Sequence, residues 1–354
     1  MALQTSGQIS MTDIVGEFGG TAPHAVSEYY GEGGLPTSGQ ISWSDFYGES
    51  AVTNYSYGVI WGGVNGYEQT NAIDRINESG SKVGTSSTLG TARSLSAGGN
   101  AGAYAIYYGG NSSTTMHSHI TRINNSGTLV GSETNASTSR YESSGAAAGS
   151  YFLVIHGNTS TDSATAPMSY QIRITDSGSV YSTDTSVSTA QKRKAGCSVE
   201  NRAAGFFWGG LASSWDTHTV SNRLSRINGN GSLVGSESTY GSSGYNAGGA
   251  ACGGTGQEGT TPTYCKCIPN NSGSSNNITR FNSSGTSLSN GTVGAVMKGT
   301  LGCRAGSTGL YYGGATGYTT SDNLDRIDGN GSQVGSSGAV SGTTSRGWQE
   351  GSQV

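Results

Sequence analysis

The chain has 354 residues, 60 of them glycine, and carries a formal net charge of −4. Only 11% of the residues are charged, where about 25% is usual, and the scattered lysines and arginines give no broad basic surface for nucleic acid or an anionic membrane. So much glycine disfavours a helical core and is common in tight-turned β-structure. No stretch reaches the roughly 20 apolar residues of a membrane span, and the N-terminus lacks the pattern of a secretory signal.

The first 50 residues contain one motif twice, as Thr5-Ser-Gly-Gln-Ile-Ser-Met-Thr-Asp-Ile14 and Thr37-Ser-Gly-Gln-Ile-Ser-Trp-Ser-Asp-Phe46. In each copy a serine stands three residues before an aspartate, which is the spacing of a capping box and predicts the start of a short helix. We expect a third such start at Ser27-Glu28. Glycines should end each helix after a turn or two, at positions 16, 19, 31 and 48. So short a segment buries little, and we expect it to order against a partner or against the rest of the chain.

This segment closely resembles the leader of many virion structural proteins of tailed bacteriophages. The resemblance rests on the Ser-Gly-x-Ile-Ser-x-x-Asp-Ile pattern, on Glu-Phe-Gly-Gly at 17–20, and on the endings Tyr-Tyr-Gly at 29–31 and Asp-Phe-Tyr-Gly at 45–48. It implies a peptide that docks an appendage onto a shared virion component. The docking residues that it suggests are Ile9, Asp13, Ile14, Ile41, Asp45 and Phe46.

From about residue 51 onward a different unit repeats six times. Its marker is an arginine between apolar residues, followed by a turn that ends in glycine, and the six arginines are Arg75, Arg122, Arg173, Arg226, Arg280 and Arg326. The steps between them are 47, 51, 53, 54 and 46 residues, the length of one propeller blade. The turn suits a hairpin in which glycine takes a positive φ. Because six equivalent arginines cannot surround one pocket asymmetrically, we expect them to pack between blades and donate to carbonyl or carboxylate groups.

Two further strands accompany each marker. An aromatic and apolar run closing on glycine reads as a strand buried on both faces, and the runs are 57–63, 105–110, 151–157, 205–210, 249–254 and 309–314. An arginine 16 residues before the first glycine-doublet position marks another strand, at Arg93, Arg140 and Arg193. We expect the basic run Lys192-Arg193-Lys194 to be a solvated strand end.

The repeated strand closing on Gly-Gly, with a loop, a third strand and a fourth strand after it, resembles the kelch repeat. The resemblance implies an all-β fold, a six-bladed kelch-like β-propeller over residues 51–354, behind an N-terminal docking segment over 1–50. In the repeat register Val354 is adjacent to Asn54. The C-terminal segment should therefore supply the innermost strand of the blade that residues 57–84 complete, which closes the ring and removes exposed edges.

The loops between the second and third strands vary most, with lengths of 9, 9, 13, 13, 23 and 9 residues. Variable insertions of repeat proteins lie on the binding face. The candidate ligand-binding aromatics of these loops are Tyr67, Trp215, Tyr264 and Tyr318. The seam places the entry of the chain at the face of the invariant turns, so we expect attachment and recognition on opposite faces.

Metal and cofactor chemistry find little support. Cys265-Lys-Cys267 in the longest loop, with Cys252 and Cys303, offers only one Cys-x-Cys pair, so we expect loop thiols and no metal site. Five cysteines are too few for a disulfide scaffold and fit a reducing compartment. His117 and His119 should project to one side of an extended segment, but no third ligand is near them in sequence.

These patterns predict a non-enzymatic virion appendage, either a tail fibre, a tail tip or a head decoration. Its propeller would bind host-surface glycan or another virion protein, and its N-terminal segment would bind other virion proteins, in several copies of a symmetric assembly without nucleic acid, cofactor or membrane insertion. A virion protein needs no signal peptide, because it is made in the host cytoplasm and released by lysis. The alternative is a glycan-processing, sialidase-like propeller enzyme, which an asymmetric cluster of acids in the central channel would favour.

Overall fold

The computed structural model describes the residues 3–4, 6–18, 22–29, 39–47, 57–65, 68–159, 167–186, 189–199, 202–212, 219–239, 249–252, 264–267, 275–282, 284–288, 291–297, 301–316, 319–343, 345, 347 and 350–353. The chain divides into two compact units, one over Met1–Asn54 and one over Tyr55–Gly256 with Thr260–Val354. In the described part, no helix has the length and apolar character that crossing a membrane requires.

The first unit consists of three short helical segments that begin at side-chain caps. They are the helix α1 (Met11–Phe18) and the 3-10 helices η1 (Val26–Tyr29) and η2 (Trp43–Phe46). Before α1, the backbone N–H of Ser10 donates to Oδ2 of Asp13 at 2.8 Å, and the N–H of Asp13 donates to Oγ of Ser10 at 3.2 Å. Hydrogen bonds from Ser10 lower the pKa of Asp13. Before η2, the N–H of Ser42 donates to Asp45 at 2.7 Å. Both predicted helix starts are confirmed.

Two details of this unit differ from the sequence prediction. The second segment begins at Val26, because the N–H of Ala25 donates to the Glu28 carboxylate at 2.9 Å and makes Ala25 the cap in place of Ser27. Gly16 lies inside α1 and does not end it. A glycine within a helix costs only about 1 kcal/mol, and the helix also holds Ile14, which is completely buried.

The three segments pack on one another around a small apolar cluster. Its buried members are Leu3, Ile14, Tyr29 and Phe46. The rings of Tyr29 and Phe46 meet edge to face, with centroids 5.9 Å apart, a favoured aromatic geometry. We expected this segment to order against a partner or the propeller, whereas the described residues form a core of their own.

The second unit is all-β, and its described strands form six four-stranded antiparallel sheets. Listed from first to fourth strand, the sheets are β30 (Glu350–Gln353), β1 (Tyr57–Trp61), β4 (Ala72–Asn77) and β5 (Ser87–Thr88); β6 (Ala97–Ala101), β7 (Tyr104–Tyr108), β10 (His119–Ile123) and β11 (Thr134–Asn135); β12 (Ser144–Ala148), β13 (Tyr151–Ile155), β14 (Tyr170–Ile174) and β15 (Val180–Ser186); β16 (Ala195–Val199), β17 (Ala204–Trp208), β18 (Arg223–Asn228) and β19 (Ser238–Thr239); β20 (Gly249–Cys252), β21 (Tyr264–Cys267), β22 (Ser275–Phe281) and β23 (Gly291–Met297); and β24 (Leu301–Ala305), β25 (Thr308–Tyr312), β28 (Asn323–Ile327) and β29 (Gly338–Ala339).

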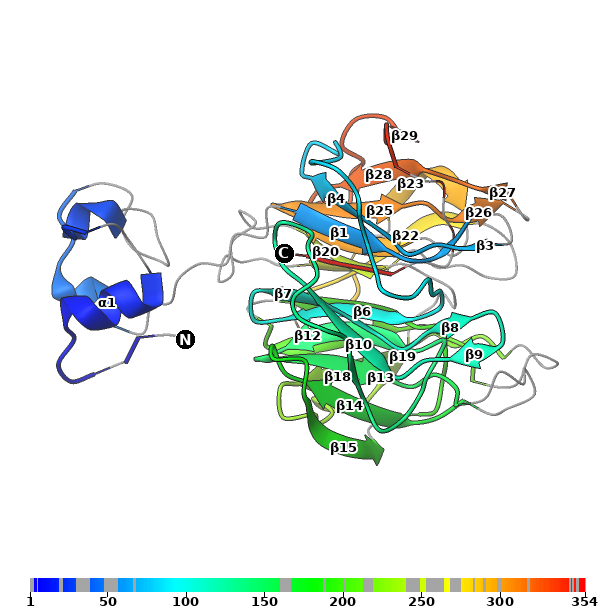
Figure 1. Cartoon of the computed structure of the whole chain (residues 1–354), viewed down its shortest axis with the longest axis horizontal. Coiled ribbons are helices and arrows are strands. Elements are labelled where there is room, and N and C mark those ends of the chain that lie inside the picture. Colours follow the sequence, from blue (N-terminus) through cyan, green and yellow to red (C-terminus); the bar gives the residue numbers. More distant parts are fainter. Residues whose placement is uncertain are drawn as a thin grey trace. The chain divides into compact units, whose positions relative to one another are not determined.

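The sheets surround a common axis as a β-propeller (Figure 1). Their first strands contact one another in the closed order β30, β6, β12, β16, β20, β24 and back to β30. Five of the sheets are described in side chains across both middle strands, whereas β21 of the remaining sheet is described in backbone only. The chain is therefore an all-β propeller with the first strand of each sheet innermost.

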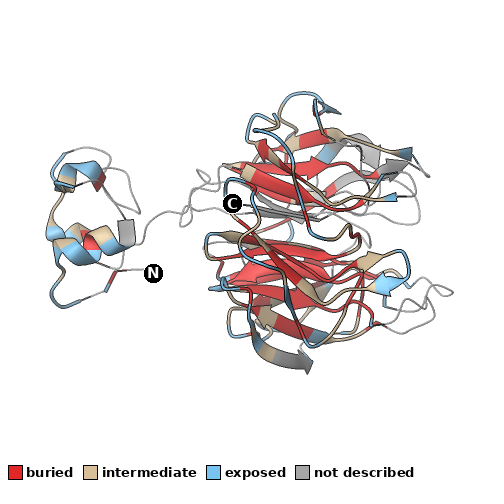
Figure 2. Ribbon diagram, in the orientation of Figure 1, coloured by how far each residue is buried: buried red, intermediate tan, exposed pale blue. Residues whose placement is uncertain are grey.

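Burial follows this arrangement. The second strands are buried on both faces, as predicted, and Val59, Ile60 and Trp61 of β1 are completely inaccessible (Figure 2). The inner strands require small residues because neighbouring backbones approach closely. A Cβ added at Gly196 would lie 2.0 Å from the carbonyl oxygen of Gly145, a distance that real contacts do not allow.

The C-terminal strand closes the ring. β30 pairs antiparallel with β1, Gly58 opposite Gln353 and Trp61 opposite Glu350, which confirms the predicted seam. The C-terminus accordingly lies beside β1 in Figure 1. At the start of β1, Tyr57 pairs with Asn77, the first residue of a third-to-fourth-strand turn. The chain thus enters the propeller at the end of the sheets that holds these turns, here called the turn end, as predicted.

The marker arginines bridge neighbouring sheets at the turn end. Each described guanidinium donates to the carbonyl two residues before the next turn's glycine, from Arg75 to Asn125 at 2.9 Å, Arg122 to Asp176 at 3.2 Å, Arg173 to Gly229 at 3.3 Å, Arg280 to Gly329 at 3.2 Å and Arg326 to Glu78 at 3.5 Å. All six turn glycines have φ between 77° and 87°. A Cβ on any of them would lie 2.6 to 3.3 Å from the neighbouring arginine. The predicted structural role of the arginines is confirmed.

The sheet that contains β20 corrects one strand assignment. The run 249–254 was expected to be the second strand, but β20 is the first strand of its sheet and pairs with β21, which is the second. Gly253-Gly254 imitated the glycine doublet in sequence, and Tyr264-Cys-Lys-Cys267 is too short and polar to be recognised. The predicted 23-residue loop from 255 to 277 therefore contains strand β21 and the start of β22.

Candidate functional site

The end of the sheets opposite the turn end, here called the loop end, holds the second-to-third-strand loops. Three of these loops form small hairpins: β2 (Val64–Asn65) with β3 (Glu68–Gln69), β8 (Asn111–Ser112) with β9 (Thr115–Met116), and β26 (Ala315–Thr316) with β27 (Thr319–Thr320). They touch across sheets, since the N–H of Ser113 donates to Oε1 of Gln69 at 2.8 Å. The loop end therefore has a continuous polar rim over three neighbouring sheets.

The predicted ligand-binding aromatics remain predictions. Tyr67, Trp215 and Tyr318 lie outside the described residues. Tyr264 belongs to strand β21, so it does not lie in a second-to-third-strand loop, and its side chain is not described.

Connections from each fourth strand to the next first strand complete the loop end, and two buried arginines brace them. The guanidinium of Arg93 donates to the carbonyl of Gly109 at 3.1 Å, and that of Arg140 donates to the carbonyl of His156 at 3.4 Å. Both side chains are inaccessible. The predicted spacing of 16 residues thus joins each arginine to the end of the second strand in its own sheet.

Arg193 does not share this role, contrary to the sequence register. Ala97 pairs with Tyr108 and Ala195 pairs with Trp208, so the position equivalent to Arg93 is Gln191. The register shifts because two residues separate β6 from β7 but four separate β16 from β17. Sequence spacing counted this longer hairpin as part of the strands.

Arg193 instead shares its position with Leu95 and Glu142. All three lie two residues before an inner strand and have positive φ, at 58°, 55° and 57°. They form a backbone staircase, because the N–H of Glu142 donates to the carbonyl of Leu95 at 2.7 Å and the N–H of Arg193 donates to that of Glu142 at 2.9 Å. Left-handed backbone costs a non-glycine residue about 1–2 kcal/mol, and such strain is concentrated at functional sites.

The run Lys192-Arg193-Lys194 is buried, and the prediction of a solvated strand end is wrong. Lys192 is completely inaccessible and its Nζ lies 3.2 Å from Oε2 of Glu142. Nε of Arg193 donates to Oε1 of the same carboxylate at 2.7 Å, and Nδ2 of Asn158 donates to Oε2 at 3.1 Å. The sequence gave no signal for this cluster, because its acid lies one blade away from its bases.

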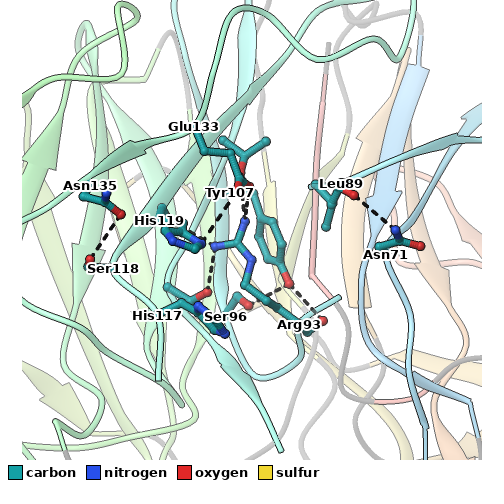
Figure 3. Close-up of polar contacts among 12 residues, drawn as sticks. Asn71, Leu89, Arg93, Ser96, Tyr107, His117, Ser118, His119, Glu133 and Asn135 are labelled. Atoms are coloured by element: carbon teal, nitrogen blue, oxygen red, sulfur yellow. Dashed lines mark hydrogen bonds and ion pairs between the residues drawn. The ribbon is translucent and has the colours of Figure 1, made fainter. Parts of the chain in front are cut away.

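A second polar cluster lies on the sheet that contains β6, and Figure 3 shows it. Nη2 of Arg93 donates to Oε1 of Glu133 at 2.8 Å, and the hydroxyl of Thr121 donates to the same oxygen. Nδ1 of His119 lies 3.6 Å from the other oxygen, Oε2. The buried arginine thus fixes a carboxylate beside a partly exposed imidazole.

His117 extends this cluster toward the β8–β9 hairpin. Its ring centroid lies 4.9 Å from that of His119, which confirms that the two side chains project to the same side. Nε2 of His117 and Oγ of Ser112 are 2.7 Å apart and share a hydrogen bond. Burial lowers the pKa of His117, and the charges of His119 and Arg93 lower it further, so that this imidazole is neutral at pH 7.

The expectation that no third polar group is near the two histidines is wrong. Glu133 comes from the following strand segment, 14 residues after His119, and only the pairing of β10 with β11 brings the two together. Among the described residues, no group of three or more histidine, cysteine, aspartate or glutamate side chains is arranged to hold a metal ion.

The cysteines also differ from the sequence prediction. Cys303 is buried with a free thiol, and burial raises its pKa to about 12. Cys197 forms a disulfide, which the cysteine count had not suggested. The side chains of Cys252, Cys265 and Cys267 are not described, and the last two lie in strand β21, not in a loop.

In the first unit, the candidate docking residues fall into three groups. Ile14 and Phe46 are completely buried in the apolar cluster. Asp13 and Asp45 are the caps of α1 and η2, and Ile9 and Ile41 lie half-buried at the edge of the cluster.

The sequence prediction missed Trp43. It is 48% exposed and stands where the first copy of the motif has the partly buried Met11. An exposed tryptophan in so small a unit is typical of a contact residue.

Comparisons with known proteins bear on the fold alone. No protein family matches the chain, and no curated protein is similar to it in sequence. Among solved structures the chain is similar to YjhT, with 12% identity and a TM-score of 0.57, over 76% of this chain and 94% of that one. Likeness at this identity supports the β-propeller architecture.

Proposed function

We propose that this protein is a structural protein of a tailed-bacteriophage virion, an appendage of the tail fibre, tail tip or head. Residues 1–50 dock it onto another virion protein, and the propeller over 51–354 binds host-surface glycan or a further virion protein. The observation that carries this proposal is the duplicated capping motif, which resembles the virion leader and folds around its own apolar cluster with Trp43 exposed. The protein is made in the host cytoplasm and becomes part of the virion.

The propeller in this proposal has six blades of kelch-like repeats. The closed order of inner-strand contacts and the six turn glycines packed against six arginines support that number. The seam at β30 supports it as well, because Arg326 of the last sheet reaches the turn of the first one at Glu78.

Attachment and recognition then belong to opposite ends of the propeller. Tyr57, the first described residue of the propeller, lies at the turn end, beside Asn77. The loop end carries the varied polar groups and the strained staircase of Leu95, Glu142 and Arg193. Repeat proteins place their variable insertions on the binding face, which makes the loop end the recognition surface.

Binding fits the propeller better than glycan hydrolysis does. Glycosidases use a pair of carboxylates that flank the scissile bond. The six inner strands contain one acidic residue in sequence, Glu350. Incubation of the protein with oligosaccharides and chromatography of the products tests the enzymatic alternative, for which new reducing ends would be the positive result.

Purified phage particles test the virion role. We expect mass spectrometry to detect the full-length chain in them and immunogold electron microscopy to place it on the head or the tail. A chain that lacks residues 1–50 should fold as a propeller but be missing from the particles, and Trp43→Ala should lower its incorporation. Particles that incorporate the shortened chain as well as the full one would refute the docking role.

A further inference from the structure

Glu133 uses only half of its capacity to accept hydrogen bonds. Its Oε1 accepts from Arg93 and Thr121, whereas no described residue donates a hydrogen bond to Oε2, and the side chain is 20% exposed. A carboxylate oxygen offers two lone pairs. The fixed carboxylate therefore keeps an acceptor for a ligand.

The two imidazoles beside it are also held in place with capacity left over. Nδ1 of His119 is buried without a hydrogen bond and faces Glu133 at 3.6 Å, while 29% of the side chain is exposed. Nε2 of His119, on the other edge of the ring, has no partner among the described residues. In His117, Ser112 engages Nε2 and leaves Nδ1 without a partner in the same part of the chain.

The equivalent position in a neighbouring sheet shows what a purely structural pair looks like. Glu237 stands where Glu133 stands, and both of its oxygens are engaged. Oε1 accepts from Ser225 at 2.6 Å, and Oε2 accepts from Thr189 at 2.6 Å and from Arg223 at 3.3 Å. Because Arg223 occupies the register position of His119, the open oxygen of Glu133 is a local departure from the repeat.

The charges at the site select the ligand class. Arg93 is inaccessible and its guanidinium is bound to Glu133, so the exposed groups are a carboxylate oxygen and imidazoles. An anionic sugar would meet the carboxylate unfavourably. Hydroxyl groups can donate to the carboxylate and either donate to or accept from the imidazoles.

We propose that Ser112, His117, His119 and Glu133 form a subsite of the loop end for an uncharged, hydroxyl-rich glycan. This inference rests on the proposed binding function of the propeller and narrows it to neutral glycans. The β8–β9 hairpin supplies one wall of the subsite through Ser112, and the β10–β11 pair supplies the other through His119 and Glu133.

An array of immobilised neutral and sialylated oligosaccharides tests the proposal with the full-length chain. We expect binding to neutral members, and His119→Ala should weaken it at least about tenfold by removing a ligand hydrogen bond. Arg223→Ala, at the same register position of another sheet, should bind like the unchanged protein. Glu133→Gln should also lose binding, but it leaves the buried Arg93 without its counter-ion, so circular dichroism must first show that it folds.

Three results would overturn the subsite: no binding by the unchanged chain, binding to sialylated members only, or equal affinities of the His119 and Arg223 variants. The virion role is judged separately from the particles. Incorporation without neutral-glycan binding would leave the virion role standing and remove the subsite. Neutral-glycan binding by a chain that is absent from particles would do the reverse.

Discussion

The turn end and the loop end of the propeller use the same strands in opposite ways. At the turn end each sheet repeats one device, an arginine that reaches the next turn, and the turn glycines differ in φ by only ten degrees. At the loop end a single register position holds Leu95, Glu142 and Arg193 in successive sheets. The repeated end thus fixes the spacing of the sheets, and the varied end is free to carry chemistry.

Charge is handled differently at the two ends as well. The latch arginines are partly exposed and donate to backbone carbonyls, so each latch is independent of the others. The loop-end charges are buried and depend on one another, since Glu142 serves both Lys192 and Arg193. Substitutions should therefore have local, equal effects at one end and large, unequal effects at the other.

The largest effect is expected for Glu142→Gln. It leaves Lys192 and Arg193 buried without their carboxylate, and breaking a buried ion pair costs about 3–5 kcal/mol of unfolding free energy. Urea denaturation followed by tryptophan fluorescence measures the loss. Glu68→Gln, at an exposed position of β3, is the control and should change stability by less than about 0.5 kcal/mol. Similar losses in the two variants would contradict the buried network.

The arginine latches should each contribute about 1.5–3 kcal/mol, the usual value of a hydrogen bond from a charged group. We expect Arg75→Ala, Arg122→Ala and Arg326→Ala to lower the free energy of unfolding by similar amounts in the same assay. Arg326 is the informative member, because its partner Glu78 lies across the seam. A negligible loss there beside full losses at the other two positions would show that the ring does not close in solution.

His156 should make the loop end sensitive to acid. Burial holds the pKa of His156 well below its ordinary value, and the charges of Lys194 and Arg140 lower it further. Below about pH 6.5 the unfolded chain binds a proton that the folded chain does not, so stability falls by up to about 1.4 kcal/mol per pH unit. His156→Asn keeps a residue that tolerates the observed φ of 61° and should flatten this slope between pH 6.5 and 5. Parallel slopes for both proteins would disprove the assignment.

The smallest effect is expected for the turn glycines. Gly127→Ala places a Cβ 3.0 Å from Cδ of Arg75 at a φ of 77°, and it should cost about 1 kcal/mol. Gly338→Ala is its matched control, because no atom lies within 4 Å of the added Cβ and its φ is not positive. Differential scanning calorimetry should resolve the two, and equal melting temperatures would count against the tight packing of arginine on turn.

The sequence by itself determined the features that repeat or act over a few residues. The six arginine markers, the glycine turns, the buried second strands and the seam could be counted, because each blade needs the same contacts at the same spacing. The caps at Ser10 and Ser42 were legible because a capping box closes within one helical turn.

The tertiary structure alone decided where residues from different blades meet. A two-residue difference in one hairpin moved Arg193 from the role of Arg93 to that of Leu95, and burial of the connection turned a basic run into the partner of Glu142. The meeting of His119 with Glu133 and the placing of β21 likewise depend on strand pairing across the sheet. Local patterns specify strands and turns, but the fold's packing sets which charges lose water and which neighbours replace it.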